Sequence, residues 1–453
     1  MSRITLGQAA QWCGGHVEEK YLDVEFLGAN NDTRKLQPGQ LFLALKGARD
    51  GHEFIPAAME KGAAAVLCTH CEGDYPAIVV EDVRIALGQI AAAERQRLGV
   101  KVVAITGSVG KSTTKEMTVS VMETTYKVSK TPENHNNDIG MPMAILAMDA
   151  DTEVAVLEMG MNHFREIAYL SDIAKPDVGV ITNVGTMHIE NLGTVEGIRQ
   201  AKLEIIEGMT ENGMLILNGD SDSRLFGFPV KGVKTMYFAT ANQKAELYAK
   251  DVTMTTEGLE FKAVTGMKEI PISLALEGTH FVADALAAVA VGLQLGVTPE
   301  KITESLSMFR NMAGRQEIFK YGDYTIIKDC YNAGPESMAA ALAVLNQKPG
   351  RHVAVLGDML ELGACTQAEH YKLGRIVAEQ ADVLLAYGPN SVRILNGART
   401  GGMPDTKARA FTDRDRLVDV LRQMVKPGDV ILFKGSRGMR MELIMDLFLQ
   451  KEE

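Results

Sequence analysis

The stretch Val102-Val-Ala-Ile-Thr106-Gly-Ser-Val-Gly-Lys-Ser-Thr-Thr114 decides the fold of this chain. Its apolar first part predicts a buried strand, and the residues that follow predict a phosphate-binding loop that opens a helix. Glycines let backbone N–H groups converge on phosphate oxygens, and the helix N-terminus favours negative charge. A P-loop of ordinary spacing would need glycine where this chain has Ile105. The pattern predicts nucleotide binding, with a plain Gly/Ser turn as the alternative.

Short apolar runs recur on both sides of this loop and predict an α/β fold. Helical patterns lie between the runs at 154–157, 178–182 and 214–217, which is typical of a parallel sheet covered by helices. The polar stretch 230–273 predicts antiparallel strands, and an Ala-rich helix is expected at 281–294. Further strands are expected at 41–45, 64–67, 77–80, 324–328, 353–356, 383–386 and 430–433.

The chain of 453 residues is too long for one ordinary domain. Its pattern changes near residues 98 and 314, so we expect three α/β domains, at 1–98, 99–314 and 315–453. The phosphate loop falls in the central domain, whose sheet is expected to be mostly parallel.

The composition indicates a soluble protein of the cytoplasm. A net charge of −11 argues against nucleic acid as a main partner. The first residues do not resemble a signal peptide, and no apolar stretch approaches the ~20 residues that span a bilayer. The five cysteines are odd in number and scattered, which predicts reduced thiols. Cys68 and Cys71 form a lone CxxC, and a zinc site is not expected because no second pair of ligands at suitable spacing is evident.

Three polar residues of the central region are candidates for catalysis or metal binding. Glu158 ends a strand, at the edge where parallel sheets bind ligands, and a carboxylate there suits Mg²⁺. His188 follows the next strand, where an ordinary loop histidine is the commoner interpretation. Lys202 lies in a helical pattern that by itself indicates a surface lysine. Spacing alone therefore leaves all three roles open.

Together these segments resemble the Mur ligase family. The stretch 106–117 is similar to that family's shortened phosphate loop, which accounts for the missing glycine. Asn183-Val-Gly with His188, and Glu196-Gly-Ile-Arg-Gln-Ala-Lys202, resemble its metal-binding histidine and its carbamylated lysine. Asp32-Thr-Arg34 is similar to part of the domain that holds a UDP-sugar. Further family landmarks are Asn134-His-Asn-Asn-Asp-Ile-Gly140, Gly314-Arg315 and Asp329-Cys-Tyr-Asn332.

Two segments select one reaction within the family. Leu356-Gly-Asp-Met-Leu-Glu-Leu-Gly363 and Lys434-Gly-Ser-Arg-Gly-Met-Arg-Met-Glu442 resemble the member that adds D-alanyl-D-alanine to UDP-N-acetylmuramoyl-tripeptide. The Asp-Asn-Pro-Arg expected of the diamino-acid-adding member is absent. The resemblance implies ATP-dependent amide formation through an acyl phosphate. It also implies an N-terminal UDP-sugar-binding domain, a central P-loop ATPase domain and a Rossmann-like C-terminal domain that receives the dipeptide.

The resemblance also implies residue roles. The expected catalytic residues are Lys111 on the β and γ phosphates, Glu158, His188 and Lys202. Two Mg²⁺ ions are expected, one on Ser112 and Glu158, and a second on His188 and the carbamate of Lys202. The residues expected to contact ATP are Gly107, Ser108, Val109, Gly110, Lys111, Ser112, Thr113, Asp284, Arg315 and Asp329. The residues expected to contact the acceptor or the dipeptide are Thr33, Arg34, Asn134, Asn137, Asn332, Lys434, Arg437 and Arg440.

Two positions depart from the family pattern. Asp284 stands where asparagine is usual, and an aspartate accepts a hydrogen bond from the adenine amino group but cannot donate to a ring nitrogen. Gly334 also replaces an asparagine. Rival interpretations are another ligase of the superfamily (the diamino-acid-adding member or a folylpolyglutamate synthetase), a nucleotide switch or ATPase, and a UDP-sugar-binding protein. A monomer is expected, and the third residue of the tripeptide, meso-diaminopimelate or L-lysine, stays open.

Overall fold

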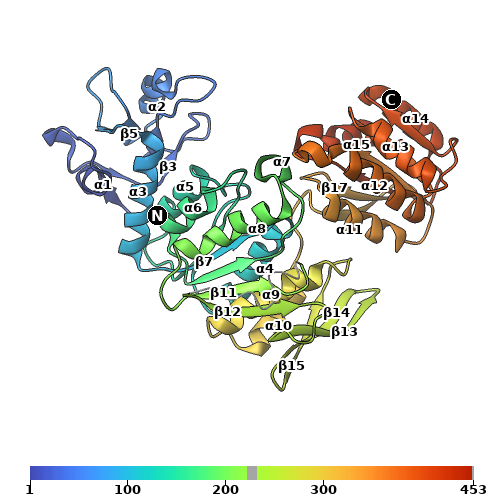
Figure 1. Ribbon diagram of the computed structural model, residues 1–453. Helices are drawn as coiled ribbons and strands as arrows, with labels where there is room; N and C mark the ends of the chain where they lie inside the picture. The colour runs from blue at the N-terminus through green and yellow to red at the C-terminus, as the bar shows by residue number, and fades with distance from the viewer. Residues whose placement is uncertain (222–231, 451–453) are drawn as a thin grey trace.

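The computed structural model describes residues 1–221 and 232–450, which form three lobes arranged as a V (Figure 1). The central lobe lies at the base, and the N-terminal and C-terminal lobes rise on either side of it. The three lobes contain a four-stranded, a nine-stranded and a six-stranded sheet respectively, and a two-stranded pair accompanies the first. The expected α/β class is therefore confirmed.

The N-terminal lobe is a small parallel sheet, of order β3-β4-β5-β6, beside one long helix. That helix begins after Asp82, whose carboxylate accepts hydrogen bonds from two backbone N–H groups, and ends before Gly99, whose φ is 65°. The elements are β1 (Ile4–Thr5), α1 (Leu6–Cys13), β2 (Glu25–Phe26), β3 (Ala29–Asn30), β4 (Leu41–Leu43), α2 (Ile55–Glu60), β5 (Ala65–Cys68), β6 (Ala77–Val79) and α3 (Val83–Leu98).

The central lobe is built around β7 (Lys101–Thr106), which lies between β10 and β9 in a sheet of order β15-β14-β13-β12-β11-β10-β7-β9-β8. The predicted antiparallel pairing is confirmed for β13, β14 and β15, whereas β12 pairs parallel with β11. Residues 230 and 231 of that predicted stretch lie outside the described residues. The strands are β8 (Val128–Lys130), β9 (Val154–Glu158), β10 (Val178–Ile181), β11 (Met214–Asn218), β12 (Lys234–Ala239), β13 (Leu247–Thr255), β14 (Gly258–Thr265) and β15 (Lys268–Leu274).

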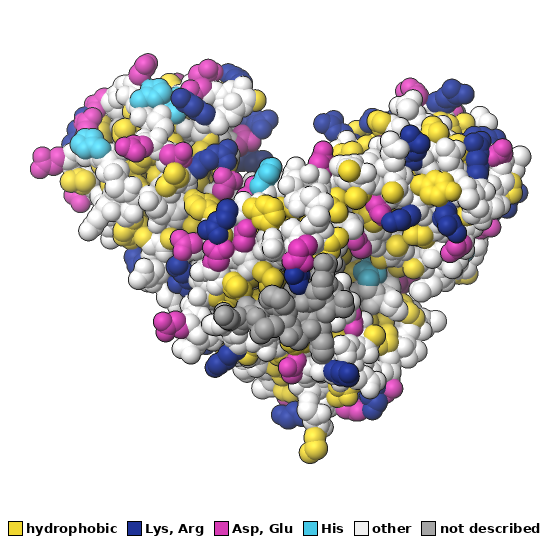
Figure 2. Space-filling model, in the orientation of Figure 1, with side chains coloured by type: hydrophobic (Ala, Val, Ile, Leu, Met, Phe, Trp, Pro, Cys, Tyr) yellow, Lys and Arg dark blue, Asp and Glu magenta, His cyan; other side chains and the backbone are white. Residues whose placement is uncertain are grey.

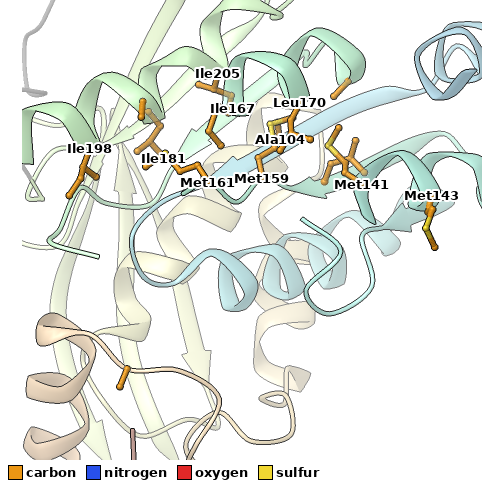
Figure 3. Packing of buried hydrophobic residues seen from close by; sticks show 14 of the residues in the cluster. Ala104, Met141, Met143, Met159, Met161, Ile167, Leu170, Ile181, Ile198 and Ile205 are labelled. Carbon is orange, nitrogen blue, oxygen red and sulfur yellow. The ribbon is translucent and has the colours of Figure 1, made fainter. Parts of the chain in front are cut away.

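Helices cover both faces of this sheet. The helices of this lobe are α4 (Lys111–Glu123), α5 (Gly140–Leu146), α6 (Glu166–Ala174), α7 (Ile189–Leu192), α8 (Val195–Leu203), α9 (Phe281–Gln294) and α10 (Pro299–Met308). On one face Ala104 of β7 clusters with Ile167 and Leu170 of α6 (Figure 3). On the other face Ile105 clusters with Met117 of α4 and with apolar residues of α9. Because β7 is buried on both faces, its sequence is almost continuously apolar, and the phosphate loop follows directly at its carboxyl end.

The C-terminal lobe has a sheet of order β16-β17-β21-β18-β19-β20, in which only β16 runs antiparallel to its neighbour. Its strands are β16 (Glu317–Tyr321), β17 (Tyr324–Asp329), β18 (His352–Gly357), β19 (Val383–Tyr387), β20 (Ala408–Phe411) and β21 (Val430–Lys434). Its helices are α11 (Pro335–Asn346), α12 (Thr366–Gln380), α13 (Ser391–Thr400), α14 (Arg414–Met424) and α15 (Met441–Leu449).

The predicted strands are present, with ends shifted by one or two residues, and α9 has the predicted bounds. Six strands were not predicted: β1, β2, β3, β8, β16 and β20. They are short or interrupted by charged residues, so they lack the apolar run that marks a buried strand. Within the described parts of the chain, we find no helix with the length and apolar character needed to cross a membrane.

Candidate active site

A cavity of about 1340 Å³ lies where the three lobes meet. Its wall includes Asp82 and Arg84 of the N-terminal lobe as well as residues of the other two lobes. Figure 2 shows the surface hollowed between the N-terminal and C-terminal lobes. The predicted site residues that line the cavity are Ser108, Val109, Gly110, Lys111, Ser112, Thr113, Asn137, Glu158, His188, Asp284, Arg315, Asp329, Asn332 and Lys434.

The phosphate loop is held by the segment that follows β10. The side-chain oxygen of Asn183 accepts hydrogen bonds from the backbone N–H groups of Ser108 and Val109, each at 2.9 Å. Gly110 precedes α4 with a φ of 82°, and a Cβ there would lie 2.4 Å from Oδ1 of Asp284. Glycine alone fits this position without displacing its neighbour. The loop therefore has one defined shape, although the family motif had not singled out Asn183 as a site residue.

The first two residues of α4 present a cation and a hydroxyl. Lys111 Nζ donates to the backbone oxygen of Gly107 at 2.7 Å. Desolvation lowers the pKa of Lys111, and the Glu158 carboxylate opposes that shift. Ser112 Oγ accepts a hydrogen bond of 2.9 Å from Arg315, at the entry to the C-terminal lobe. The hydroxyl of the phosphate loop thus already contacts a cation from the next lobe.

Glu158, at the end of β9, is buried, and only one of its two carboxylate oxygens has a hydrogen-bond partner among the described residues. Its Oε1 accepts a hydrogen bond of 2.9 Å from Asn136, and its Oε2 has no hydrogen-bond partner among the described residues. Lys115 Nζ lies 3.9 Å from Oε2, too far for a hydrogen bond. A buried carboxylate oxygen without a donor is unfavourable, and a cation would remove that cost. Asn136 was missed because the sequence offers three similar asparagines in one loop.

His188 lies between two lobes. Its φ of 65° is uncommon for a residue with a Cβ. Its Nδ1 lies 2.7 Å from Oε2 of Glu361 in the C-terminal lobe, although the geometry is not that of a hydrogen bond. The imidazole lowers the pKa of Glu361. The histidine expected to bind metal is thus placed against a carboxylate that the sequence analysis did not select.

Lys202 lies in α8 and is 1% exposed. It is absent from the described cavity wall, although Lys111 is near enough to act on its charge. Desolvation, assisted by Lys111, lowers the pKa of Lys202 well below its ordinary value. The prediction of a surface lysine from the helical pattern is therefore wrong. Burial favours the neutral amine, which is the form that carbamate formation requires.

Asp284 lies in the first turn of α9, against the phosphate loop. Its Oδ1 accepts a hydrogen bond of 2.9 Å from the Thr114 hydroxyl. Desolvation raises the pKa of Asp284 to about 7, against the effects of Thr114 and Arg315. The carboxyl group thus contributes to the support of the loop as well as to the cavity wall.

Asp329 and Lys434 form a pair where β17 and β21 end side by side. Lys434 Nζ lies 2.6 Å from Oδ2 of Asp329 and 3.1 Å from the backbone oxygen of Asn332. Because Lys434 is only 2% exposed, its charge is largely committed to this pair. It is not a free anchor for a substrate carboxylate in this arrangement.

The remaining predicted substrate residues do not line the described cavity wall: Thr33, Arg34, Asn134, Arg437 and Arg440. Arg34 Nη2 lies 2.8 Å from Oδ2 of Asp32, and Arg437 Nη1 lies 2.9 Å from Oε1 of Glu442. Both arginines are largely exposed, so they would contact a substrate in the cavity only if that substrate extended beyond the cavity wall or the lobes moved.

His280, Tyr331 and Glu336 are among the residues of the cavity wall that were not predicted. His280 precedes α9, and desolvation lowers its pKa to about 4. The Tyr331 ring lies 4.1 Å from the guanidinium carbon of Arg315. Glu336 in α11 accepts hydrogen bonds from Thr186. Tyr331 stands within the family landmark at 329–332 and could have been selected, whereas Glu336 belongs to none of the quoted motifs.

The donor set fits Mg²⁺ held by few protein ligands. Within residues 1–221 and 232–450, no three His, Cys, Asp or Glu side chains form a metal-binding group. Mg²⁺ commonly uses one or two carboxylates and completes its octahedron with water and substrate phosphates. The Ser112 hydroxyl and the unpartnered oxygen of Glu158, on one cavity wall, match that mode.

Comparison with known families places three matched segments along the chain. Residues 24–95 match the Mur ligase family catalytic domain, residues 105–292 the Mur ligase middle domain, and residues 314–437 the Mur ligase glutamate ligase domain.

Close relatives match over nearly the whole length. The UDP-N-acetylmuramoyl-tripeptide–D-alanyl-D-alanine ligase of Bacillus subtilis (strain 168) is 41% identical, with 92% of each chain covered. The enzyme of that name from Escherichia coli (strain K12) is 35% identical, with 98% of each chain covered. A MurF crystal structure from Acinetobacter baumannii has a TM-score of 0.91 at 33% identity and covers 100% of each chain. MurF ligase from Thermotoga maritima in complex with ADP has a TM-score of 0.83 at 29% identity, covering 93% of this chain and 97% of that one.

Proposed function

This chain belongs to the Mur ligase family and is an ATP-dependent ligase that forms C–N bonds, and we propose that it joins D-alanyl-D-alanine to UDP-N-acetylmuramoyl-tripeptide. The products are the UDP-linked pentapeptide, ADP and phosphate, in the synthesis of the peptidoglycan precursor. The observation that carries the proposal is one cavity, lined by the phosphate loop, Glu158, His188 and the C-terminal lobe, in a chain that matches ligases of this name almost end to end.

The three lobes divide the substrates among them. Residues 1–98 hold the UDP-sugar, 99–314 bind ATP, and 315–453 receive the dipeptide and part of ATP. Thr33, Arg34, Asn134 and Asn137 serve the acceptor, and Asn332, Arg437 and Arg440 serve the dipeptide. Lys434 joins them only once its pairing with Asp329 is broken. Because several of these residues lie away from the cavity, this assignment requires the outer lobes to move inward, which would also exclude water.

The reaction passes through an acyl phosphate. ATP transfers its γ-phosphoryl group to the terminal carboxylate of the tripeptide, and the incoming amine then displaces phosphate from the acyl carbon. Lys111 and Arg315 supply fixed positive charge where negative charge gathers between the nucleotide and the acceptor. Gly107, Ser108, Val109, Gly110 and Thr113 shape the loop around the phosphates. Asp284 accepts from the adenine amino group, and Asp329 contacts the ribose.

Two Mg²⁺ ions are proposed. Ser112 and Glu158 would hold one, and His188 and the carbamate of Lys202 the other. Bound Mg²⁺ supplies charge neutralisation at the phosphates. The buried position of Lys202 supports carbamylation, because the neutral amine adds CO₂ to give an oxygen-bearing anion. The substrates, ATP and UDP-linked precursors, support a cytoplasmic enzyme, which we take to act as a monomer and without nucleic acid.

Phosphate release from ATP tests the proposal. The tripeptide substrate and D-alanyl-D-alanine are added to the purified protein separately and together, and the product mass is measured. Release that requires both, with the mass of the pentapeptide, is the expected result. Release with neither substrate, or no response to any muramoyl acceptor, would exclude the proposed reaction.

A further inference from the structure

Glu336 brings a carboxylate of the C-terminal lobe onto the segment of the central lobe that leads to His188. Its Oε1 accepts hydrogen bonds from the backbone N–H and the hydroxyl of Thr186, at 2.9 and 3.1 Å. A Cβ on Gly185 would lie 2.7 Å from the same oxygen. The backbone of that segment therefore accommodates this carboxylate closely.

The charge of Glu336 has no cationic partner among the described residues. Its Oε2 is shielded from solvent and accepts no hydrogen bond there. Asp329 of the same lobe differs, since its Oδ2 lies 2.6 Å from Nζ of Lys434. A carboxylate that lines a cavity with one unsatisfied oxygen is arranged for a ligand that donates hydrogen bonds and carries positive charge.

An ammonium group suits this carboxylate better than a metal ion does. Within the described residues no group of three potential metal-ligating side chains is present, so Glu336 belongs to no multi-ligand metal site there. An ammonium carries three donors and needs no fixed coordination geometry. Ala340 and Ala341 of the same helix, and Met187, also line the cavity. Ala340 lies one helical turn after Glu336 on the same face of α11, which leaves room for a small aliphatic body beside the charge.

We propose that Glu336 binds the ammonium group of the incoming D-alanyl-D-alanine dipeptide. The inference rests on the proposed function and names the residue that holds its amine substrate. The position of Glu336 beside Thr186 puts the amine on the wall that also carries His188, where the acyl phosphate is proposed to form. The small side chains of Ala340 and Ala341 face the methyl groups of the dipeptide.

The test uses the full-length enzyme with three substitutions. Glu336→Gln keeps an acceptor for Thr186 and removes the charge, Glu336→Asp keeps the charge on a shorter side chain, and Glu379→Gln removes an exposed charge of α12 as the control. With the tripeptide and ATP saturating, Glu336→Gln should raise the KM for the dipeptide about 10- to 100-fold and change kcat far less. Glu336→Asp should recover part of the loss, and Glu379→Gln should match the wild type.

Two further measurements separate amine binding from a structural role. Propionyl-D-alanine replaces the ammonium with hydrogen, so its inhibition constant should be the same for the wild type and Glu336→Gln. Hydroxylamine traps the acyl phosphate formed from ATP and the tripeptide alone, and that rate should also be unchanged.

The outcomes that would overturn the inference are equally distinct. They are an unchanged KM for the dipeptide, a raised KM for ATP or the tripeptide, a raised Mg²⁺ requirement, or weaker inhibition by propionyl-D-alanine in Glu336→Gln. A wild-type enzyme that makes no hydroxamate and shows no dipeptide-dependent turnover would overturn the proposed function itself, and this inference with it.

Discussion

Arg315 donates a hydrogen bond of 2.9 Å to the hydroxyl of Ser112, so the C-terminal lobe contacts the phosphate loop through one guanidinium. The same group lies over the ring of Tyr331, 4.1 Å from its centre. Stacking and hydrogen bonding fix its orientation, and a cation held in this way stabilises developing negative charge without reorganising.

Arg315→Lys should lower kcat/KM for ATP by about 10- to 100-fold, because an ammonium cannot stack and donate in the same fixed geometry. Steady-state phosphate release with varied ATP measures this. Arg399→Lys, which alters an exposed arginine paired with Asp405, is the matched control. Equal values for Arg315→Lys and the control would show that the contact does not serve the nucleotide.

Asp284→Asn should reduce the pH dependence of stability. The pKa of Asp284 is raised to about 7 in the folded protein, against about 3.9 in an unfolded chain. The folded state binds more protons between those values, so this group's contribution to the free energy of unfolding falls as pH rises from about 4 to about 7. The free energy of unfolding, measured by urea denaturation, should therefore favour the variant over the wild type increasingly from pH 4 to pH 7, by about 1 kcal/mol or more. A constant difference across that range would contradict the prediction.

Gly110→Ala should destabilise the protein by about 1–3 kcal/mol and abolish ATP binding, because both its φ of 82° and its contact with Asp284 oppose a Cβ. Gly402→Ala is the control, since Gly402 has a φ of 96° and open space around the added carbon. Chemical denaturation and nucleotide titration measure the two effects. If both variants lose the same stability and both bind ATP, the close approach to Asp284 has no consequence.

Lys202→Ala should lower ligase turnover by at least about 100-fold, because the carbamate proposed to hold Mg²⁺ could not form. In ¹³C-bicarbonate, the wild-type enzyme should show a carbamate resonance that disappears in this variant. Lys372→Ala, which removes an exposed lysine, should retain the resonance. A carbamate signal that survives in Lys202→Ala would assign the modification to another lysine.

The sequence alone predicted those strands and helices whose apolar pattern is set by their burial in the fold. The run at 102–106 is apolar because both faces of β7 are covered, and α9 is Ala-rich because it is buried along most of its length. The short strands β8 and β20 could not be found in this way, because pairing in the folded sheet defines them more than their own side chains do.

The site was predictable where a motif is contiguous and unpredictable where partners come from distant segments. The phosphate loop and Glu158 were selected because they follow predicted strands, and residues 108–113 and Glu158 line the cavity. The contact between His188 and Glu361 joins residues far apart in the chain, and nothing local indicates it. Likewise, the choice among three asparagines depends on the rotamer that brings Asn136 to Glu158.

The position of β7 in its sheet has a consequence during synthesis. It is the first strand of the nine to be translated, yet its two neighbours, β9 and β10, end at residues 158 and 181. At about 5–20 residues per second, the strand stays without one neighbour for roughly 4–15 s after residue 106 is made. A nascent chain with an apolar strand open on both edges is a substrate for chaperones. We therefore expect translation speed between residues 106 and 181 to influence the yield of folded enzyme.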